Sequence, residues 1–113
     1  MKANEVRIGN YINYTTEREI VTMQITYEYI RLIHNGDKKF KPIELTEEWV
    51  LKFGFKQISE RVYIKNYHYG YEFGITNIFI IKNDNCFMRY KHIQYVHELQ
   101  NLYFALTNEE LTL

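Results

Sequence analysis

Alternating apolar and polar positions predict β-strands over the first quarter of the chain. Residues 6–14 are rich in β-branched and aromatic side chains, which predicts one strand, or two short ones, with a tight bend at Gly9–Asn10. Residues 19–25 alternate in the same way and predict a second strand. One face of that strand would hold Val21, Met23 and Ile25.

Residues 26–33 fit two structures. The β-branched content of Tyr29–Ile33 favours a third strand, whereas Thr26 can cap a short helix that ends at Ile33. We predict the strand and keep the helix as the alternative. The next segment, Asn35–Lys39, has the composition of a solvated turn.

The clearest local signal is a short helix over residues 46–53. Thr46 can accept a hydrogen bond from the first free N–H groups, and two glutamates follow it where the helix dipole favours negative charge. Gly54 is placed to end the helix in a left-handed conformation. Trp49 and Phe53 are four residues apart, so we expect them to share a face and to anchor the helix on a sheet.

The second half of the chain predicts an antiparallel meander followed by a helix. The strands are expected at residues 61–65, 69–73, 77–82 and 86–90. Apolar residues recur at helical spacing over residues 94–106 and predict an amphipathic helix. The predicted fold is therefore α+β. It is a twisted antiparallel sheet or small open barrel with a short central helix and a C-terminal amphipathic helix, in a single domain over residues 1–113.

Charge and composition exclude several classes of function. Fourteen basic side chains balance fourteen acidic ones, so no overall field steers the protein to nucleic acid or to an anionic membrane. The chain has no signal-peptide pattern and no apolar run of the roughly eighteen residues that span a bilayer. The lone Cys86 cannot form an internal disulfide, which suits a reducing compartment. We expect a soluble cytoplasmic protein.

Sequence marks of catalysis and of metal binding are missing. The chain contains no GxxxxGK[ST], GxGxxG, GxSxG or HExxH pattern, and its four histidines lack the i, i+4 spacing of a zinc-binding pair. Cys86 lies in an apolar segment with no neighbouring basic helix start to activate it. We therefore predict that the protein is not an enzyme and binds no cofactor and no metal.

The most suggestive chemistry is a run of tyrosines with a lysine and a histidine between them. On one regular strand, the four tyrosines of residues 63–71 would project to the same side: Tyr63, Tyr67, Tyr69 and Tyr71. Exposed aromatic rings bind protein partners or stack on nucleic-acid bases, whereas buried ones would pack under the C-terminal helix. The partner-binding residues predicted from this run are Lys65, Tyr67, Tyr69 and Tyr71.

A second charged patch is predicted in the turn before the central helix. Lys38, Lys39 and Lys41 form a small basic cluster that can contact phosphate, although three lysines in a turn also serve simply to keep it solvated.

Three segments carry a distinctive pattern. They are VRIGNY over Val6–Tyr11, KPIELTEEWVLKFGF over Lys41–Phe55 and YVHELQNLYFALT over Tyr95–Thr107. Together they cover about a third of the chain and resemble a family of small, functionally uncharacterised proteins of Bacteroidetes genomes and their prophages. The motifs mark that family rather than any chemistry, so the resemblance assigns no functional residue.

The resemblance implies a biological context. Small single-domain proteins of phages and mobile elements are often inhibitors of host defence. By analogy of context, this chain resembles anti-CRISPR proteins against type VI-B RNA-guided RNA nucleases. We predict a non-enzymatic binding protein that inhibits a defence nuclease by protein contact or by interference with guide RNA. The alternatives are a protein that sequesters a small ligand such as a cyclic nucleotide, and a structural or regulatory accessory domain.

Overall fold

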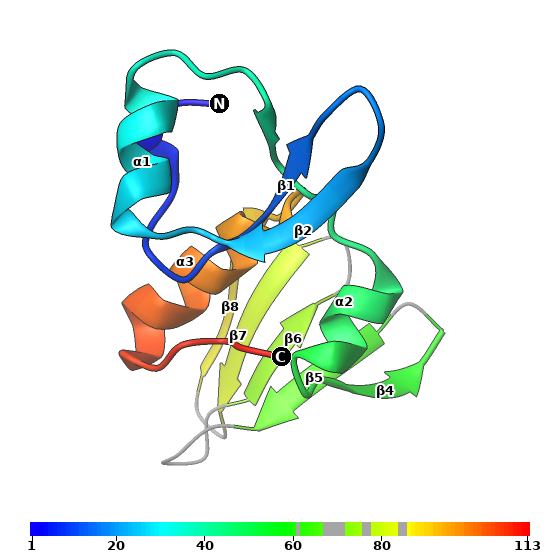
Figure 1. The fold of residues 1–113 in the computed structure, drawn as a ribbon. Coiled ribbons are helices and arrows are strands. Elements are labelled where there is room, and N and C mark those ends of the chain that lie inside the picture. The colour runs from blue at the N-terminus through cyan, green and yellow to red at the C-terminus, as the bar shows by residue number, and fades with distance from the viewer. Residues whose placement is uncertain (61, 67–71, 76–77, 84–85) are drawn as a thin grey trace. The chain divides into compact units, whose positions relative to one another are not determined.

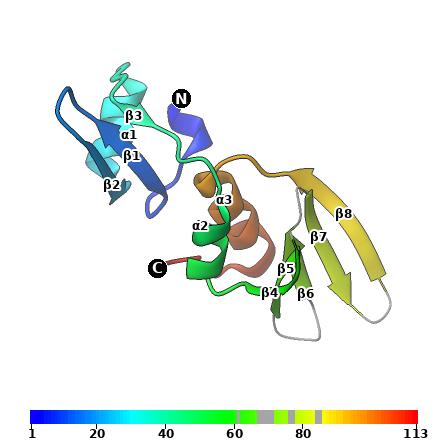
Figure 2. The same cartoon turned by 90° about the vertical axis from the view of Figure 1, so that its right-hand side faces the viewer.

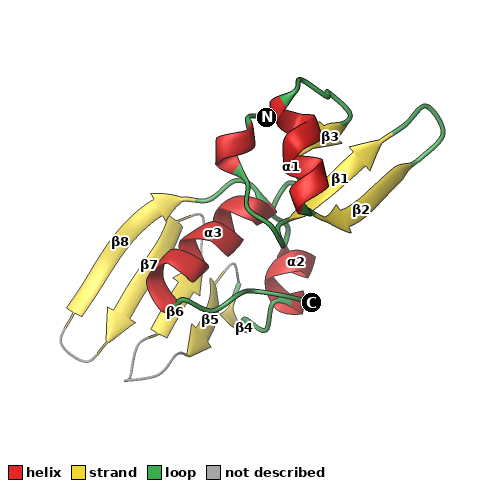
Figure 3. Ribbon diagram, turned by 60° about the vertical axis from the view of Figure 1, so that its left-hand side comes forward, coloured by secondary structure: helices red, strands yellow, loops and turns green. Residues whose placement is uncertain are grey.

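The computed structural model describes residues 1–60, 62–66, 72–75, 78–83 and 86–113 (Figure 1). Its helices and strands confirm the predicted α+β class, and its strands are divided between two antiparallel sheets (Figure 3). The chain forms two compact units. Unit 1 comprises residues 1–44 and 94–111, and unit 2 comprises residues 45–93 and 112–113.

Unit 1 contains a three-stranded sheet in the order β2-β1-β3. Its elements are η1 (Ala3–Glu5), β1 (Tyr11–Thr15), β2 (Ile20–Gln24), α1 (Tyr27–His34), β3 (Phe40–Lys41) and α3 (Val96–Thr107). The buried core consists of Val6, Ile12, Ile25, Ile33 and Phe40. Ile12 lies in β1, Ile33 in α1 and Phe40 in β3, while Val6 and Ile25 lie just outside the strands, so the sheet and α1 share one apolar layer.

The strand predicted over residues 6–14 forms only in its second half. A turn precedes β1, in which Asn10 N–H donates to the Arg7 carbonyl (3.1 Å) and Gly9 has a φ of 95°. The predicted bend at Gly9–Asn10 is thus confirmed, and it ends the extended conformation before β1. The second predicted strand is confirmed as β2, which pairs antiparallel with β1.

The strand predicted over Tyr29–Ile33 is wrong, because the chain forms helix α1 there. Tyr29 and Ile30 lie half-buried against the core and Ile33 is buried within it, which is the spacing of a helical face. Burial of this face outweighs the weak strand preference of β-branched residues, since packing commonly overrides propensity. Thr26 occupies the N-cap position, as the alternative interpretation placed it, but its side chain makes no capping hydrogen bond.

The C-terminal helix is confirmed as α3 and contacts β1 in unit 1. Its start is fixed by Glu98, whose carboxylate accepts hydrogen bonds from the backbone N–H groups of Gln94 (3.2 Å) and Tyr95 (3.0 Å). Its end is marked by Asn108, which adopts a left-handed conformation with a φ of 59°. The buried positions of α3 include the apolar residues Val96, Leu99, Leu102 and Tyr103.

Unit 2 contains a five-stranded antiparallel sheet whose strands follow chain order (Figure 2). Its elements are α2 (Glu47–Lys52), β4 (Lys56–Ser59), β5 (Val62–Asn66), β6 (Glu72–Ile75), β7 (Ile78–Asn83) and β8 (Cys86–His92). The predicted meander is confirmed, with one additional strand, β4, that sequence reasoning missed. β4 escaped prediction because it is short and each of its residues is exposed, so no apolar face marks it.

The predicted short helix is confirmed as α2. Thr46 caps it by accepting a hydrogen bond from Trp49 N–H (3.5 Å), and two glutamates occupy its first turn. The rings of Trp49 and Phe53 lie 5.7 Å apart, with Phe53 buried and Trp49 half-buried. Within the described residues, no helix is long and apolar enough to cross a membrane.

Candidate functional site

The predicted basic cluster lies in unit 1 on both sides of a buried aromatic anchor. Phe40 is buried between the rings of Tyr14, at 5.0 Å, and Tyr29, at 5.5 Å. Because Phe40 turns inward, its neighbours Lys39 and Lys41 are exposed, as is Lys38. The fold therefore presents all three lysines to solvent.

The backbone around Lys39 is tied to the end of β1. Lys39 N–H donates to the Asp37 carboxylate (2.8 Å), and the Lys39 carbonyl accepts from Thr15 N–H (2.9 Å). β3 pairs antiparallel with β1 immediately after this point. These bonds fix Lys39 next to the loop that joins β1 to β2.

The β1–β2 loop is held in turn by Thr16. Its hydroxyl oxygen accepts from the N–H groups of Arg18 (3.3 Å) and Glu19 (3.2 Å), and Thr16 N–H donates to the Glu19 carbonyl (2.9 Å). The loop and Lys39, which precedes β3, together form a cleft of about 320 Å³. The cleft is lined by Thr16, Glu17, Arg18 and Lys39.

Arg18 joins the three predicted lysines in a group that we call the basic corner: Arg18, Lys38, Lys39 and Lys41. Sequence reasoning missed Arg18, since about twenty residues separate it from the lysines and only the pairing of β1 with both β2 and β3 brings it to the cleft that Lys39 lines. No local sequence pattern around Arg18 predicts that it lies near Lys39.

The electrostatics of the cleft favour a short-range contact with an anion. Residues 16–19 and 37–41 carry four cationic side chains and three carboxylates, so the local net charge is only slightly positive. Recognition therefore depends on where Arg18 and Lys39 lie rather than on a long-range field. A guanidinium and an ammonium lining one cleft can contact a phosphate or a carboxylate, and Glu17 can accept from a neighbouring donor of the same ligand.

Lys65, predicted to bind a partner, makes an internal contact in unit 2. Its half-buried ammonium donates to the carbonyl of Phe53 (3.0 Å), at the C-terminal end of α2. A cation at this end of a helix interacts favourably with the helix dipole. This contact gives Lys65 a structural role in joining β5 to α2, and a role in partner binding stays a prediction.

Tyr63 is the only tyrosine of the predicted run within the described residues, and it is buried. Burial raises the pKa of its phenol, and a hydrogen bond to the Glu47 carboxylate of α2 raises that pKa further. For this residue the structure agrees with the alternative in which tyrosines pack in the core.

Tyr67, Tyr69 and Tyr71 lie outside the described residues, so their predicted binding role is untested. On either side of them, β5 ends at Asn66 and pairs antiparallel with β6, which begins at Glu72.

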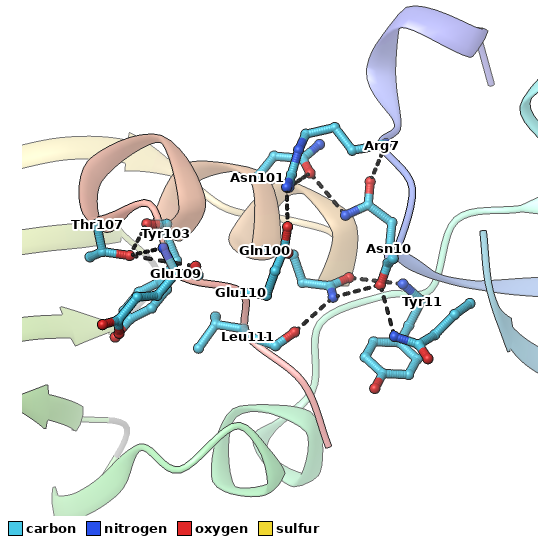
Figure 4. Close-up of polar contacts among 12 residues, drawn as sticks. Arg7, Asn10, Tyr11, Gln100, Asn101, Tyr103, Thr107, Glu109, Glu110 and Leu111 are labelled. Carbon is cyan, nitrogen blue, oxygen red and sulfur yellow. Dashed lines mark hydrogen bonds and ion pairs between the residues drawn. The ribbon is translucent and has the colours of Figure 1, made fainter. Parts of the chain in front are cut away.

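A buried polar network in unit 1 connects the two ends of the chain (Figure 4). Gln100 is fully buried, and its amide oxygen accepts from Tyr11 N–H (2.8 Å). Its amide nitrogen donates to the carbonyls of Leu111 (2.9 Å) and Gly9 (3.2 Å). One side chain thus joins α3, the turn before β1 and the C-terminal segment.

Asn10 and Arg7 extend this network. The Asn10 side chain accepts from Arg7 N–H (2.6 Å) and donates to the Asn101 carbonyl oxygen (2.8 Å). The Arg7 guanidinium donates to that same oxygen (3.0 Å), pairs with the Glu110 carboxylate and lies 3.9 Å from the centre of the Phe104 ring. These contacts join residues 6–11 to residues 95–107, so both segments contribute to holding unit 1 together.

No family model, curated protein or solved structure matches this chain. The resemblance to a prophage family therefore stays a prediction from the sequence. Within the described part of the chain, no group of three or more histidine, cysteine or acidic side chains is arranged to hold a metal ion. The basic corner is the candidate functional site that the described residues support.

Proposed function

We propose that this protein is a non-enzymatic binding protein whose basic corner contacts an anionic surface on its partner. The observation that carries the proposal is that Arg18 and Lys39, which are distant in the sequence, line the same cleft. The side chains of Thr16 and Asp37 accept hydrogen bonds from the backbone N–H groups of Arg18 and Lys39, and so hold both segments in place before a partner binds. Such preorganisation reduces the entropy lost when a complex forms.

We infer from the motif resemblance that the partner is a bacterial defence nuclease and that the protein acts in the host cytoplasm. An RNA-guided nuclease offers two kinds of anionic surface: carboxylates of the protein and phosphates of the guide RNA. Arginine and lysine bind both. Contact with either would inhibit the enzyme without catalysis, by covering its surface or by interfering with guide RNA.

Affinity capture from a Bacteroidetes host lysate, with and without RNase, tests this proposal. The bait is the full chain, compared with a variant that carries Arg18→Glu and Lys39→Glu. A matched control carries Lys2→Glu and Lys56→Glu, which changes the net charge equally at two exposed positions outside the cleft.

We expect the wild type and the control to recover a large nuclease, and the Arg18→Glu, Lys39→Glu variant to lose it. Recovery that survives RNase indicates protein contact, and recovery that RNase abolishes indicates contact through RNA. If the cleft variant captures the nuclease as well as the control does, the basic corner is not the binding site. If the wild type captures no nuclease, stable inhibition is refuted.

The cleft also supports a second candidate, the sequestration of a small anionic ligand such as a cyclic nucleotide. Its volume of about 320 Å³ lies at the lower end of the roughly 300–1,000 Å³ range of small-molecule sites. Its lining is charged rather than aromatic, so phosphate recognition by Arg18 and Lys39 would dominate. Isothermal titration with cyclic mononucleotides and dinucleotides tests it. Heat that disappears in the Arg18→Glu, Lys39→Glu variant supports sequestration, and the absence of heat with the wild type excludes it for those ligands.

A further inference from the structure

The edge strands of the two sheets differ in how well they are protected against pairing with another strand. Proteins commonly guard an edge with charge, with a short strand or with an irregular register. Among the described strands, β3 has two residues including Lys41, β4 contains Lys56 and a register shift, and β8 pairs with β7 through a register shift. β2 is different: its five residues, Ile-Val-Thr-Met-Gln, include neither a charge nor a proline.

The outer edge of β2 is also accessible. β2 is the last strand on its side of the β2-β1-β3 sheet, and four of its five residues are exposed. Ile20 is 66% exposed and Val21 is 37% exposed, which is high for apolar side chains on a strand. An accessible, uncharged edge of this length is a template for another strand.

The hydrogen bonds at both ends of β2 define which backbone groups point outward. At one end, Thr16 N–H donates to the Glu19 carbonyl (2.9 Å), and at the other Ile25 N–H donates to the Asn10 carbonyl (2.8 Å), so Glu19 and Ile25 both bond toward the β1 side. Antiparallel pairs alternate between bonded and non-bonded positions, so Val21 and Met23 also bond toward β1. The N–H and C=O groups that point toward the free edge are those of Ile20, Thr22 and Gln24.

We propose that β2 pairs antiparallel with β2 of a second copy of this chain, with Thr22 opposite Thr22 of the partner subunit. In this register Ile20 faces Gln24 of the partner subunit, and the reverse pair follows from the two-fold symmetry. The three residues with outward groups, Ile20, Thr22 and Gln24, therefore pair with the same three residues of the second copy. Each of their outward N–H and C=O groups then has a hydrogen-bond partner. The result is one continuous sheet in the order β3-β1-β2-β2-β1-β3.

Side chains and charges agree with this register. Val21 lies opposite Met23 of the partner subunit in a non-bonded pair, where side chains approach most closely, and both are apolar. Glu19 falls opposite Ile25 of the partner subunit and Arg18 opposite Thr26 of the partner subunit, so no like charges face each other. Five residues a side are far fewer than the roughly 20–30 of a standard interface, so the association is weak and depends on concentration.

Sedimentation velocity of the full chain, from about 10 µM to about 1 mM, tests the proposal because it spans weak dissociation constants. The variants are Thr22→Lys and Thr22→Glu, alone and mixed in equal amounts. Thr22 is exposed, and each substitution places two like charges face to face at the centre of the pair. Thr112→Lys and Thr112→Glu are matched controls at an exposed threonine outside the sheets. Circular dichroism checks that each variant is folded.

We expect a reversible monomer–dimer equilibrium for the wild type and for both controls. Each Thr22 variant alone should dissociate at least tenfold more readily, and the mixture should recover dimer because opposite charges then meet. A wild type that stays monomeric at the highest concentration overturns the proposal and leaves the edge to a strand of a different protein. Thr22 variants that dimerise as the wild type does, or a mixture that stays monomeric, overturn it as well. The inference does not depend on the basic corner.

Discussion

Replacing Gln100 with methionine isolates the contribution of its buried amide to stability. Methionine has nearly the same length and volume but can neither donate nor accept the hydrogen bonds seen here. Gln100→Met removes the partners of Tyr11 N–H and of the Leu111 carbonyl, while the Gly9 carbonyl keeps a hydrogen bond from the Gln24 side chain (3.2 Å). The substitution therefore leaves two backbone groups without the contact they have in the wild type.

The size of the effect follows from these two groups. A buried group that loses its partner costs about 1–3 kcal/mol, and burial of the methionine's apolar atoms offsets part of that cost. We expect Gln100→Met to lower the free energy of unfolding by about 2–4 kcal/mol. Gln94→Met is the matched control, since Gln94 is exposed just before α3 and should change stability by less than about 0.5 kcal/mol.

Urea denaturation followed in parallel by far-ultraviolet circular dichroism and by tryptophan fluorescence measures the change. Trp49 is the single tryptophan and lies in unit 2, whereas Gln100 lies in unit 1. If the chain is one cooperative domain, as predicted, both signals shift together. A shift confined to circular dichroism would contradict the single domain. A loss below about 1 kcal/mol would refute the argument that the amide is needed.

Two further predictions concern unit 2. Tyr63→Phe should lessen the loss of stability at high pH. Burial and Glu47 raise the pKa of Tyr63 above its ordinary value of 10.0. The neutral phenol therefore stabilises the fold below pH 10.0, and this stabilisation is lost as the pH rises through the raised pKa. Urea midpoints at about pH 9 and about pH 11 check this, and equal losses in wild type and variant would contradict it. Gly54→Ala should lower the melting temperature more than Gly36→Ala. Both glycines have positive φ (90° and 92°), and a Cβ at Gly36 meets nothing within 4 Å. A Cβ at Gly54 would lie 2.8 Å from Lys65 Nζ, so the ammonium would have to move and give up its hydrogen bond to the Phe53 carbonyl. The shared strain costs about 1–2 kcal/mol, and equal shifts would show that Lys65 yields without cost.

The amino-acid sequence alone determined the elements whose causes are local. α2 was predictable because its cap, its acidic first turn and its C-terminal glycine lie within nine residues. α3 was predictable because its apolar residues recur at helical spacing. The lysines of the basic corner were recognisable because they cluster in the chain.

Tertiary structure decided what depends on contacts between distant segments. α1 is a helix because Ile33 and its neighbours find an apolar layer formed by β1, β2 and β3, and that burial outweighs their strand preference. Arg18 belongs to the candidate site only because β1 pairs on both sides. The buried amide of Gln100 acts through backbone groups of Gly9 and Tyr11, about ninety positions earlier. Local propensity carries no information about such partners, because the free energy that selects them arises only when the segments meet.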